Sequence, residues 1–391
     1  MYNIKTYNKI SLSGLSRFPS TKYSVSDTVE NPEGILLRSH KLHDEPIPSC
    51  LLAIARAGAG VNNLPVESYT AKGIVAFNTP GANANAVKEL VLTGMLLASR
   101  GIISGMQYAQ QLVTIDDAAV MHKRLESEKK RFAGSELVGK TLGVVGLGAI
   151  GSMVTEMALS LGMKVLGYDP ALSIEAAWRL PSQVKKMDDL HSLLANADFV
   201  SLHVPAIEPT FHLINNVALK HIKKGSVLLN FARETIVDPD AIVESLDAGC
   251  LGQYVCDFPE PCLLGRNDVM AMPHIGASTA EAEENCAIMA VDQLMNFLES
   301  GNIKNSVNFP NVTMDRAGVC RLTFTNINVA GVLGEVLSVF TSYQVNVVDM
   351  VNRSRGEIAY NIIDLEQLPE EKALADIRSL ENVIGLRLIL H

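Results

Sequence analysis

The chain has 391 residues, of which 48% are hydrophobic and 19% charged, enough for two or three packed domains. Its formal net charge of −9 argues against a nucleic-acid partner, because binding to phosphates requires a basic surface. No apolar run could span a bilayer, the N-terminus lacks the apolar core of a signal peptide, and the six cysteines form no close pair. We therefore expect a cytoplasmic protein with reduced thiols, no membrane contact and no metal site.

The first clear strand and helix pattern lies before residue 100. The apolar run GIVAF, residues 73–77, leads into the turn NTPGAN, and an amphipathic pattern from about Ala84 predicts a long helix. Strands that alternate with helices favour a parallel sheet. Residues 107–131 are polar, charged and weakly periodic, so we interpret them as an excursion between structural units.

A strand-helix-strand pattern follows at residues 139–170. Residues 141–145 predict a strand, which leads through a glycine turn into a helix and then into a second strand that ends at Asp169. Helical stretches separate most of the later apolar runs, which are FVSLHVP, SVLLNFA, GQYVCDF and DVMAMPH. This alternation is typical of a doubly wound nucleotide-binding domain.

The composition changes after Gly301. Residues 302–318 are polar and rich in turn-forming residues, and we interpret them as a linker. In the last 72 residues, 320–391, strand and helix patterns alternate in the order βαββαβ. This order predicts a separate small domain.

A glycine-rich motif marks the candidate cofactor site. Gly146, Gly148 and Gly151 follow a predicted strand and open a predicted helix, the context that a dinucleotide fingerprint requires. The first glycine permits a tight turn, the second lets the backbone approach a pyrophosphate, and the third lets helix and strand pack closely. Asp169, 18 residues after Gly151, can accept hydrogen bonds from a ribose and would repel a 2′-phosphate. The motif therefore predicts NAD rather than NADP.

Three ionisable residues follow apolar runs downstream of this motif. Arg233 lies in LNFARETIVD, Glu260 in DFPEP and His274 in PHIGAST. Oxidation of a 2-hydroxy acid needs a cation for the carboxylate, a base for the hydroxyl proton, and a carboxylate that orients the base and raises its pKa. Arg233, His274 and Glu260 can fill these three roles in that order.

The chain resembles the D-isomer-specific 2-hydroxyacid dehydrogenases over essentially its whole length. The motifs that carry the resemblance are RAGAGVNN, NTPGANANAVKELVL, GKTLGVVGLGAIG, SLHVP, NFARETIVD, DFPEP and PHIGAST. Within that family it resembles the D-3-phosphoglycerate dehydrogenases, because of RAGAG, PHIGAST and a C-terminal domain similar to the amino-acid-sensing ACT module. The resemblance implies NAD-dependent oxidation of 3-phospho-D-glycerate to 3-phosphohydroxypyruvate, the first step of L-serine biosynthesis.

The resemblance also implies an α/β protein with two Rossmann-like doubly wound domains and a C-terminal βαββαβ ACT domain. The discontinuous substrate-binding domain would comprise residues 1–93 and 279–309, the NAD-binding domain residues 94–278, and the ACT domain residues 318–391. Closure of the cleft between the first two domains would exclude water during hydride transfer.

Ligand contacts are implied in the same way. The implied cofactor contacts, besides Arg233 and His274, are Thr79, Gly146, Gly148, Ala149, Ile150, Gly151, Asp169, Val204, Phe231, Ala232, Asp257, Gly276 and Ala277. The candidate substrate contacts, chosen partly because a phosphate needs cations, are Arg38, Arg56, Ala57, Gly58 and Lys140. L-serine as an effector between paired ACT modules would meet Asn328 and Asn346, with Asn326 beside them.

The sequence departs from the family pattern at three places. Glu234 follows the candidate catalytic arginine, where the family usually has glycine, and the spacing from Asp257 to Glu260 is shorter than usual. Ala330 stands where ACT modules normally carry a proline. In an alternative interpretation of the tail, Asn328 only caps the helix that begins near Gly331 and Asn346 only closes a turn.

Two other functions fit the same motifs. One is a dehydrogenase or reductase for another D-2-hydroxy acid, such as 2-hydroxyglutarate or glyoxylate, because the three candidate catalytic residues do not distinguish substrates. The other is an NAD-sensing binding protein similar to the transcriptional corepressors of this family, which keep those residues but lack an ACT domain. The resemblance further implies a homodimer or homotetramer, with residues 107–131 as a candidate partner arm.

Overall fold

The computed structural model describes residues 1–390 and divides the chain into two compact units. Unit 1 comprises residues 1–83 together with the chain from residue 280 onward, and unit 2 comprises residues 84–279. The sequence placed the first boundary after residue 93 and the second after residue 278. The assignment of substrate, NAD and effector roles to domains with those boundaries stays a prediction.

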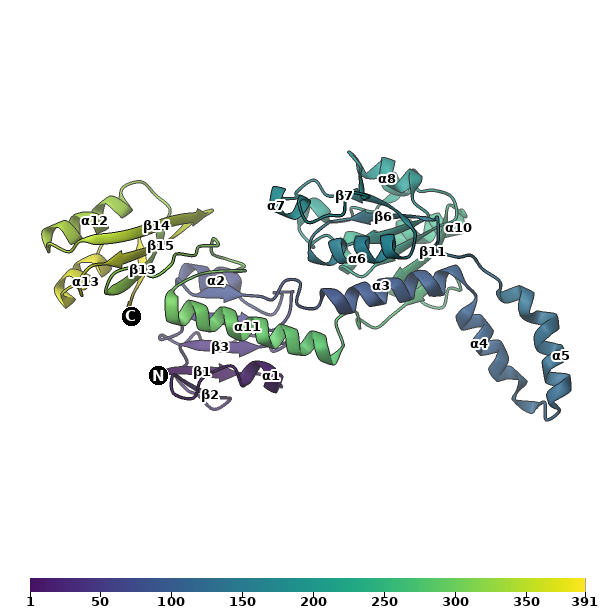
Figure 1. Cartoon of the computed structure of the whole chain (residues 1–391), viewed down its shortest axis with the longest axis horizontal. Coiled ribbons are helices and arrows are strands. Elements are labelled where there is room, and N and C mark those ends of the chain that lie inside the picture. The colour runs from purple at the N-terminus through teal and green to yellow at the C-terminus, as the bar shows by residue number, and fades with distance from the viewer. Residues whose placement is uncertain (391) are drawn as a thin grey trace. The chain divides into compact units, whose positions relative to one another are not determined.

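A five-stranded parallel sheet forms the core of unit 1 (Figure 1), in the order β2-β1-β3-β4-β5. Its strands are β1 (Tyr2–Thr6), β2 (Tyr23–Ser26), β3 (Gly34–Leu37), β4 (Ala53–Arg56) and β5 (Val75–Phe77). Strands β3, β4 and β5 are almost entirely buried, as apolar strands are in a parallel sheet that is covered on both faces. This strand order is one of those that doubly wound sheets adopt, so the predicted doubly wound fold is confirmed.

Helices pack against both faces of this sheet. The long helix α11 (Ala280–Ser300) packs on the face that carries Leu36 and Ala55, together with α1 (Leu12–Leu15). The opposite face, with Leu37 and Ile54, packs against Tyr69 of α2 (Val66–Ala71). Successive strand residues point to opposite faces, so one apolar strand supplies both cores.

The C-terminal part of unit 1 is a four-stranded antiparallel sheet in the order β14-β15-β13-β16. Its elements are β13 (Cys320–Ile327), α12 (Val332–Ser342), β14 (Val347–Arg355), β15 (Ile358–Leu365), α13 (Glu371–Arg378) and β16 (Val383–Leu390). The predicted βαββαβ order is therefore confirmed. Both helices pack on one face of the sheet, and Tyr360 and Ile362 on the other face join the core around α11.

Residues 302–318 connect the two sheets of unit 1, but they are packed rather than free. Phe309 is fully buried, and the side chain of Asn308 accepts the Ala76 N–H at 2.9 Å. Arg321, at the start of β13, is completely buried and forms an ion pair with Asp364, and its guanidinium also donates to main-chain carbonyls of residues 300, 314 and 315. The sequence pattern of polar and turn-forming residues did not reveal these contacts.

A seven-stranded parallel sheet forms the core of unit 2, in the order β12-β11-β10-β9-β6-β7-β8. Its strands are β6 (Thr141–Val145), β7 (Lys164–Tyr168), β8 (Lys185–Lys186), β9 (Phe199–Leu202), β10 (Ser226–Asn230), β11 (Leu251–Cys256) and β12 (Val269–Ala271). The strand order changes direction between β6 and β9. In doubly wound sheets ligands bind at the carboxyl ends of the strands at this point.

Helices lie on both faces of the unit 2 sheet (Figure 1). They are α3 (Ala84–Ser99), α6 (Ala149–Ser160), α7 (Ile174–Ala177), α8 (Leu190–Asn196), α9 (Asn216–Leu219) and α10 (Pro239–Asp247). Helix α3 packs against α6, β10 and β11, and Ala84 in its first turn is already buried. Because the whole helix belongs to this core, the unit begins at Ala84 rather than at the predicted residue 94.

Two further helices, α4 (Ile102–Gln111) and α5 (Ala118–Glu128), project from the body of unit 2 as an arm (Figure 1). Neither contains a buried residue. A helix that packs against no core needs no apolar face, so the hydrophobic periodicity of this segment is weak. For that reason the sequence predicted only an excursion here and no helices. None of the helices in residues 1–390 has the length and apolar content of a bilayer span.

Candidate active site

The loops that follow the strands of unit 2 all lie at one edge of its sheet, because the strands are parallel. This edge carries the glycine loop after β6, Asp169 after β7, Val204 after β9, and Arg233 after β10. Asp257, Glu260 and His274 follow β11 and β12 at the same edge. The predicted catalytic residues therefore come from neighbouring loops, and most of the predicted cofactor contacts are at the same edge.

Each glycine of the fingerprint has a different local environment. Gly146 has φ +90°, and a Cβ there would lie 2.5 Å from the His203 carbonyl oxygen. A Cβ on Gly151 would lie 1.9 Å from the Gly146 carbonyl oxygen, because α6 starts directly against the turn. Gly148 is exposed, and a Cβ added to it would meet no other part of the chain within 4 Å. The fold thus requires Gly146 and Gly151, and open space adjoins Gly148.

The amino end of α6 is open, and Asp169 orders the loop beside it. Gly148 is the N-cap residue, Ala149 and Ile150 form the first turn, and no side chain in the described chain caps this end. The Asp169 carboxylate accepts the Leu147 N–H at 2.8 Å and the Ala171 N–H at 2.9 Å. Uncapped N–H groups at a helix start favour an anion, so this arrangement fits a dinucleotide pyrophosphate.

A half-buried histidine lies beside the glycine turn. His203 lies next to Gly146, and its Nε2 is 2.8 Å from the Ser201 Oγ. Its Nδ1 is buried and has no hydrogen-bond partner within residues 1–390. Burial lowers the pKa of His203 to about 3, so its ring is neutral at physiological pH.

Arg233 is held by a residue that the sequence did not single out. Asn230 is fully buried at the end of β10, where its side chain accepts the Ala232 N–H at 3.1 Å and donates to the Arg233 carbonyl at 2.9 Å. Its Nδ2 also lies 3.3 Å from the Tyr254 hydroxyl. Glu234, in place of the usual glycine, is exposed and is not among the described non-glycine residues with positive φ. The backbone here therefore does not require glycine.

The His274 loop is fixed by Asp257. Asp257 is 1% exposed, its Oδ1 accepts the Ile275 N–H at 2.8 Å, and its Oδ2 accepts the Gly276 N–H at 2.7 Å. Its main-chain carbonyl accepts the His274 N–H at 3.0 Å, and His274 itself is exposed with φ +57°. The structure thus gives Asp257 a positioning role, whereas the sequence assigned it to the cofactor.

The Phe258 ring contacts both Arg233 and His274. Its ring centroid is 4.5 Å from that of His274, and the Arg233 guanidinium carbon is 5.7 Å from the same ring. Within the described residues no hydrogen bond or ion pair joins Glu260 to His274, so the pairing of these two residues stays a prediction. An aromatic residue directly after a strand-end aspartate was the signal that could have identified Phe258 in the sequence.

The predicted substrate contacts are split between the two units. In unit 1, Arg38 directly follows β3 and Arg56 is the last residue of the adjacent strand β4. The Arg56 Nε donates to the Arg38 carbonyl at 2.9 Å. Ala57 is buried, the Arg56 guanidinium lies 3.5 Å from a Cβ position on Gly58, and Arg38 forms an ion pair with Glu283 at 2.8 Å. Thr79 is fully buried after β5 in the same unit.

Lys140 lies at the other edge of the unit 2 sheet. It precedes β6, whereas the glycine loop follows it, and a five-residue strand is about 16 Å long. Burial acts to raise the pKa of Asp198, but Lys223, and more weakly Lys140, hold this pKa below its usual value. The topology therefore does not support a substrate contact by Lys140.

The three asparagines predicted for the effector differ in exposure. Asn326 is 4% exposed, and its Oδ1 accepts a hydrogen bond from Asn361 at 2.8 Å. Asn328 is exposed and donates to the Gly356 carbonyl at 3.1 Å, while Gly331, with no side-chain cap, is the N-cap of α12. Asn346 is exposed and donates to Glu366 at 2.8 Å. The alternative interpretation of Asn328 as a helix cap is therefore wrong.

The strand order, the glycine loop and the adjacent acidic residue define unit 2 as a dinucleotide-binding domain. Residues 102–276 match the family model described as D-isomer specific 2-hydroxyacid dehydrogenase, NAD binding domain. The chain belongs to the D-isomer specific 2-hydroxyacid dehydrogenase family, and unit 2 carries its NAD binding domain.

Relatives and a solved structure extend this result. A D-3-phosphoglycerate dehydrogenase of Methanocaldococcus jannaschii is 34% identical over 354 residues, which cover 88% of this chain and 64% of the relative. One of Haemophilus influenzae is 32% identical over 352 residues, which cover 87% of this chain and 81% of the relative. The NAD⁺-bound 3-phosphoglycerate dehydrogenase of Entamoeba histolytica has a TM-score of 0.61 at 24% identity, covering 78% of this chain and 98% of that one, which shows the fold alone.

Proposed function

We propose that the chain oxidises 3-phospho-D-glycerate to 3-phosphohydroxypyruvate with NAD as the oxidant. The observation that carries this proposal is the extent of the similarity to the two relatives named D-3-phosphoglycerate dehydrogenase. Their alignments cover 88% and 87% of the chain. The part of the chain before the C-terminal domain, residues 1–319, is a smaller share than this, so each alignment must include part of that domain. A dehydrogenase without that domain would not account for this extent.

We assign the proton chemistry to the carboxyl edge of the unit 2 sheet. His274 takes the proton of the 2-hydroxyl group, and Arg233 holds the substrate carboxylate through a two-pronged hydrogen bond. NAD, when bound, accepts the hydride that leaves C2. The Phe258 ring, which contacts both side chains, supports their mutual orientation. Glu260 is the proposed partner of the imidazolium that forms on His274.

The proposed NAD contacts follow the open amino end of α6. Gly148, Ala149 and Ile150 offer main-chain N–H groups to the pyrophosphate, and the space beside Gly148 favours close approach. Asp169 is proposed to accept hydrogen bonds from the adenosine ribose. In unit 1, Arg38 and Arg56 at the carboxyl ends of adjacent strands are the proposed cations for the substrate phosphate.

A substrate panel tests this function. NADH formation is measured with 3-phospho-D-glycerate, D-glycerate, D-2-hydroxyglutarate and glycolate, the reduced partner of glyoxylate. The proposal requires that the phosphorylated acid has the highest kcat/KM. It also requires that Arg38→Ala or Arg56→Ala lowers the ratio of kcat/KM for 3-phospho-D-glycerate to kcat/KM for D-glycerate. Equal kcat/KM values for the phosphorylated and unphosphorylated acids would favour the alternative of another 2-hydroxy acid, and NAD binding without turnover would favour a corepressor-like protein.

We also propose that L-serine binds between two paired C-terminal domains. Within one domain Asn328 and Asn346 lie at opposite ends of the sheet, because β14 and β13 each pair antiparallel to β15. Antiparallel pairing of two β14 edges would place Asn346 of one copy near the end of the partner sheet that carries Asn328. Both side chains are exposed, and an amide offers a donor and an acceptor to a zwitterion.

The arm formed by α4 and α5 is the proposed contact between copies in a homodimer or homotetramer. It exposes several apolar side chains, and those with the largest exposed fractions are Met106 (66%), Val113 (81%) and Val120 (54%). Apolar side chains that gather on a projecting element favour burial against a partner. Light scattering on the intact chain and on the double variant Met106→Asp, Val120→Asp tests this proposal. The variant is expected to form assemblies of lower molar mass than the original chain.

A further inference from the structure

Arg38, one of the two cations proposed for the substrate phosphate, already has an acidic partner within unit 1. Its Nη1 lies 2.8 Å from the Oε1 of Glu283, which belongs to the first turn of α11. The side chains of Arg38 and Glu283 are 40% and 45% exposed, so a dissolved anion can reach both groups. A phosphate that binds Arg38 therefore meets a carboxylate at the same guanidinium.

The main chain at Arg38 is fixed by side chains from three other segments. The Arg56 Nε and the Asn63 Nδ2 donate to the Arg38 carbonyl at 2.9 and 3.3 Å. The side-chain oxygen of Asn8 accepts the N–H groups of the next two residues, 39 and 40, at 3.0 and 2.8 Å. Because these bonds hold the loop, Arg38 stays within reach of Glu283.

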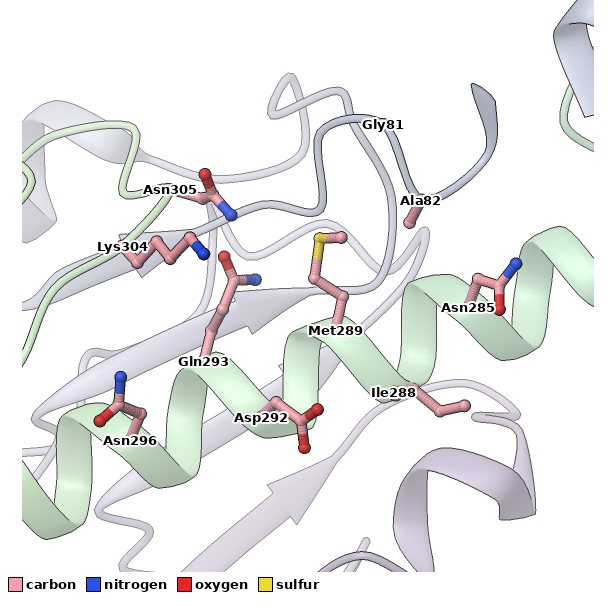
Figure 2. A pocket seen from close by; sticks show the side chains of 10 residues that line it. All are labelled: Gly81, Ala82, Asn285, Ile288, Met289, Asp292, Gln293, Asn296, Lys304 and Asn305. Carbon is pink, nitrogen blue, oxygen red and sulfur yellow. The ribbon is translucent and has the colours of Figure 1, made fainter. Parts of the chain in front are cut away.

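Helix α11 holds Glu283 on a fixed element as well. The buried face of the helix packs into the core of unit 1, and Gln293 donates from it to the Asn78 carbonyl at 3.0 Å. Figure 2 shows Met289 and Gln293 pointing from α11 toward the turn after β5 that carries Gly81. The ion pair at Arg38 thus joins two elements that are each anchored elsewhere.

The two arginines and Glu283 share a neighbour, the buried thiol of Cys286 on α11. Burial raises the pKa of this thiol, the charges of Arg38 and Arg56 act in the opposite direction, and the charge of Glu283 acts with burial. The three charged groups therefore lie around one point beside the carboxyl ends of β3 and β4. Two guanidinium groups and one carboxylate leave one net positive charge for a phosphate group that carries about −1.5 to −2 at pH 7.

The start of a helix does not by itself explain this ion pair. Acidic residues are favoured in the first turn because they face the positive end of the helix dipole, and Glu281 fills that role in α11 too. Glu284 is exposed one residue beyond Glu283. Neither Glu281 nor Glu284 forms an ion pair with a residue that the structure describes, whereas Glu283 does.

We propose that Glu283 is a specificity-determining residue, whose carboxylate competes with the substrate phosphate for the Arg38 guanidinium and so reduces the preference for phosphorylated acids. This role rests on the proposed function, in which Arg38 binds that phosphate. A guanidinium has five N–H groups, so the phosphate can bind the edge of Arg38 that Glu283 leaves open, but the two anions then repel each other at close range. If Glu283 only held Arg38 in place, its removal would weaken phosphate binding instead.

Glu283→Gln tests this role, because it removes the charge and keeps the shape of the side chain. We expect KM for 3-phospho-D-glycerate to fall about 3- to 10-fold with little change in kcat, as removal of one exposed like charge near a phosphate predicts. The kcat/KM for D-glycerate, which has no phosphate, should change less than about 2-fold, and the control Glu284→Gln should match the original chain with both acids. Salt at about 1 M should reduce the gain, because it screens exposed charges.

A second background shows whether Glu283 acts through Arg38. In Arg38→Ala, the further change Glu283→Gln should alter KM for 3-phospho-D-glycerate by no more than about 2-fold. Calorimetry with 3-phospho-D-glycerate in the presence of NADH, which cannot accept a hydride, compares the same chains without turnover.

The two measurements separate a failure of this role from a failure of the proposed function. An original chain that binds 3-phospho-D-glycerate but forms no NADH from it would contradict the proposed function, while tighter binding by Glu283→Gln would still support the role of Glu283. Equal or weaker binding by Glu283→Gln, an equal gain in the Arg38→Ala background, or no binding by either chain would overturn that role.

Discussion

Replacing Asp257 with asparagine measures how far one buried carboxylate positions His274. The two carboxylate oxygens accept N–H groups of Ile275 and Gly276 at 2.8 and 2.7 Å, and asparagine can accept only one of them. A hydrogen bond to a charged acceptor contributes about 1.5–3 kcal/mol, and a buried donor left unpaired costs about 1–3 kcal/mol. The expected cost of keeping the native loop is therefore about 3 kcal/mol or more, if the loop does not move.

The loop is free to escape this cost by leaving its native conformation. His274 has φ +57°, which is unfavourable for a non-glycine residue, so the released loop gains by relaxing. If the full cost of about 3 kcal/mol appears as detachment, the fraction of chains with His274 in place falls roughly 100-fold. We therefore expect Asp257→Asn to lower kcat by up to about 100-fold, or to lower the free energy of unfolding by up to about 3 kcal/mol, with the two losses together accounting for the cost.

The assay combines steady-state kinetics with urea unfolding. Asp189→Asn is the matched control, since Asp189 also accepts two hydrogen bonds, from the N–H and hydroxyl of Ser192, but does so as the exposed N-cap of α8. Asparagine is an equally good N-cap, so this variant should match the original chain in both measurements. The reasoning about Asp257 is refuted if its variant matches the control in both kcat and the free energy of unfolding.

Four further predictions follow from the site and its surroundings. His274→Ala should reduce kcat at least ~10²-fold with nearly unchanged NAD affinity, and unchanged turnover would exclude His274 as the base. Asp169→Ala should raise the ratio of kcat/KM for NADP to that for NAD, because a repulsive charge and a ribose acceptor are removed, and a constant ratio would contradict the assignment. Calorimetry should detect L-serine binding to the intact chain and weaker binding to Asn346→Ala; no heat with millimolar serine would exclude the proposed effector site. Burial lowers the pKa of His203 to about 3 against roughly 6.5 in the unfolded chain, so the unfolded chain binds the extra proton between these values. The free energy of unfolding should therefore be fully retained above about pH 6.5 and fall as the pH drops, by at most about 2 kcal/mol at pH 5, and urea unfolding of His203→Asn should show a smaller loss.

The alternation of strands and helices was readable in the sequence because each apolar run is continuous and local. The predicted strand at residues 141–145 coincides with β6, and the βαββαβ order of the tail is confirmed. The reasons for two glycines were also readable, since Gly146 has a positive φ and Gly151 touches the turn. These properties depend on a few neighbouring residues, so a short window contains the information.

Elements without a buried face and segments without an apolar pattern were predicted less well. The arm contains two helices that the sequence reduced to an excursion, because neither buries a residue. Residues 302–318 were interpreted as a linker on composition, yet Phe309 lies in the core. Asn326 was grouped with exposed effector contacts, but its partner Asn361 lies on another strand, β15, which the sequence pattern does not reveal.

By itself, the sequence determined the layers of this protein, the place of the glycine loop, and which ionisable residues lie in the loops after the strands. Only the tertiary structure decided which partner each side chain has. Asp257 meets the N–H groups of residues 18 and 19 positions later, and Gln293 meets a carbonyl 215 positions earlier. The physical reason is that periodicity encodes which face of an element is buried, whereas hydrogen bonds between loops depend on how separate elements pack.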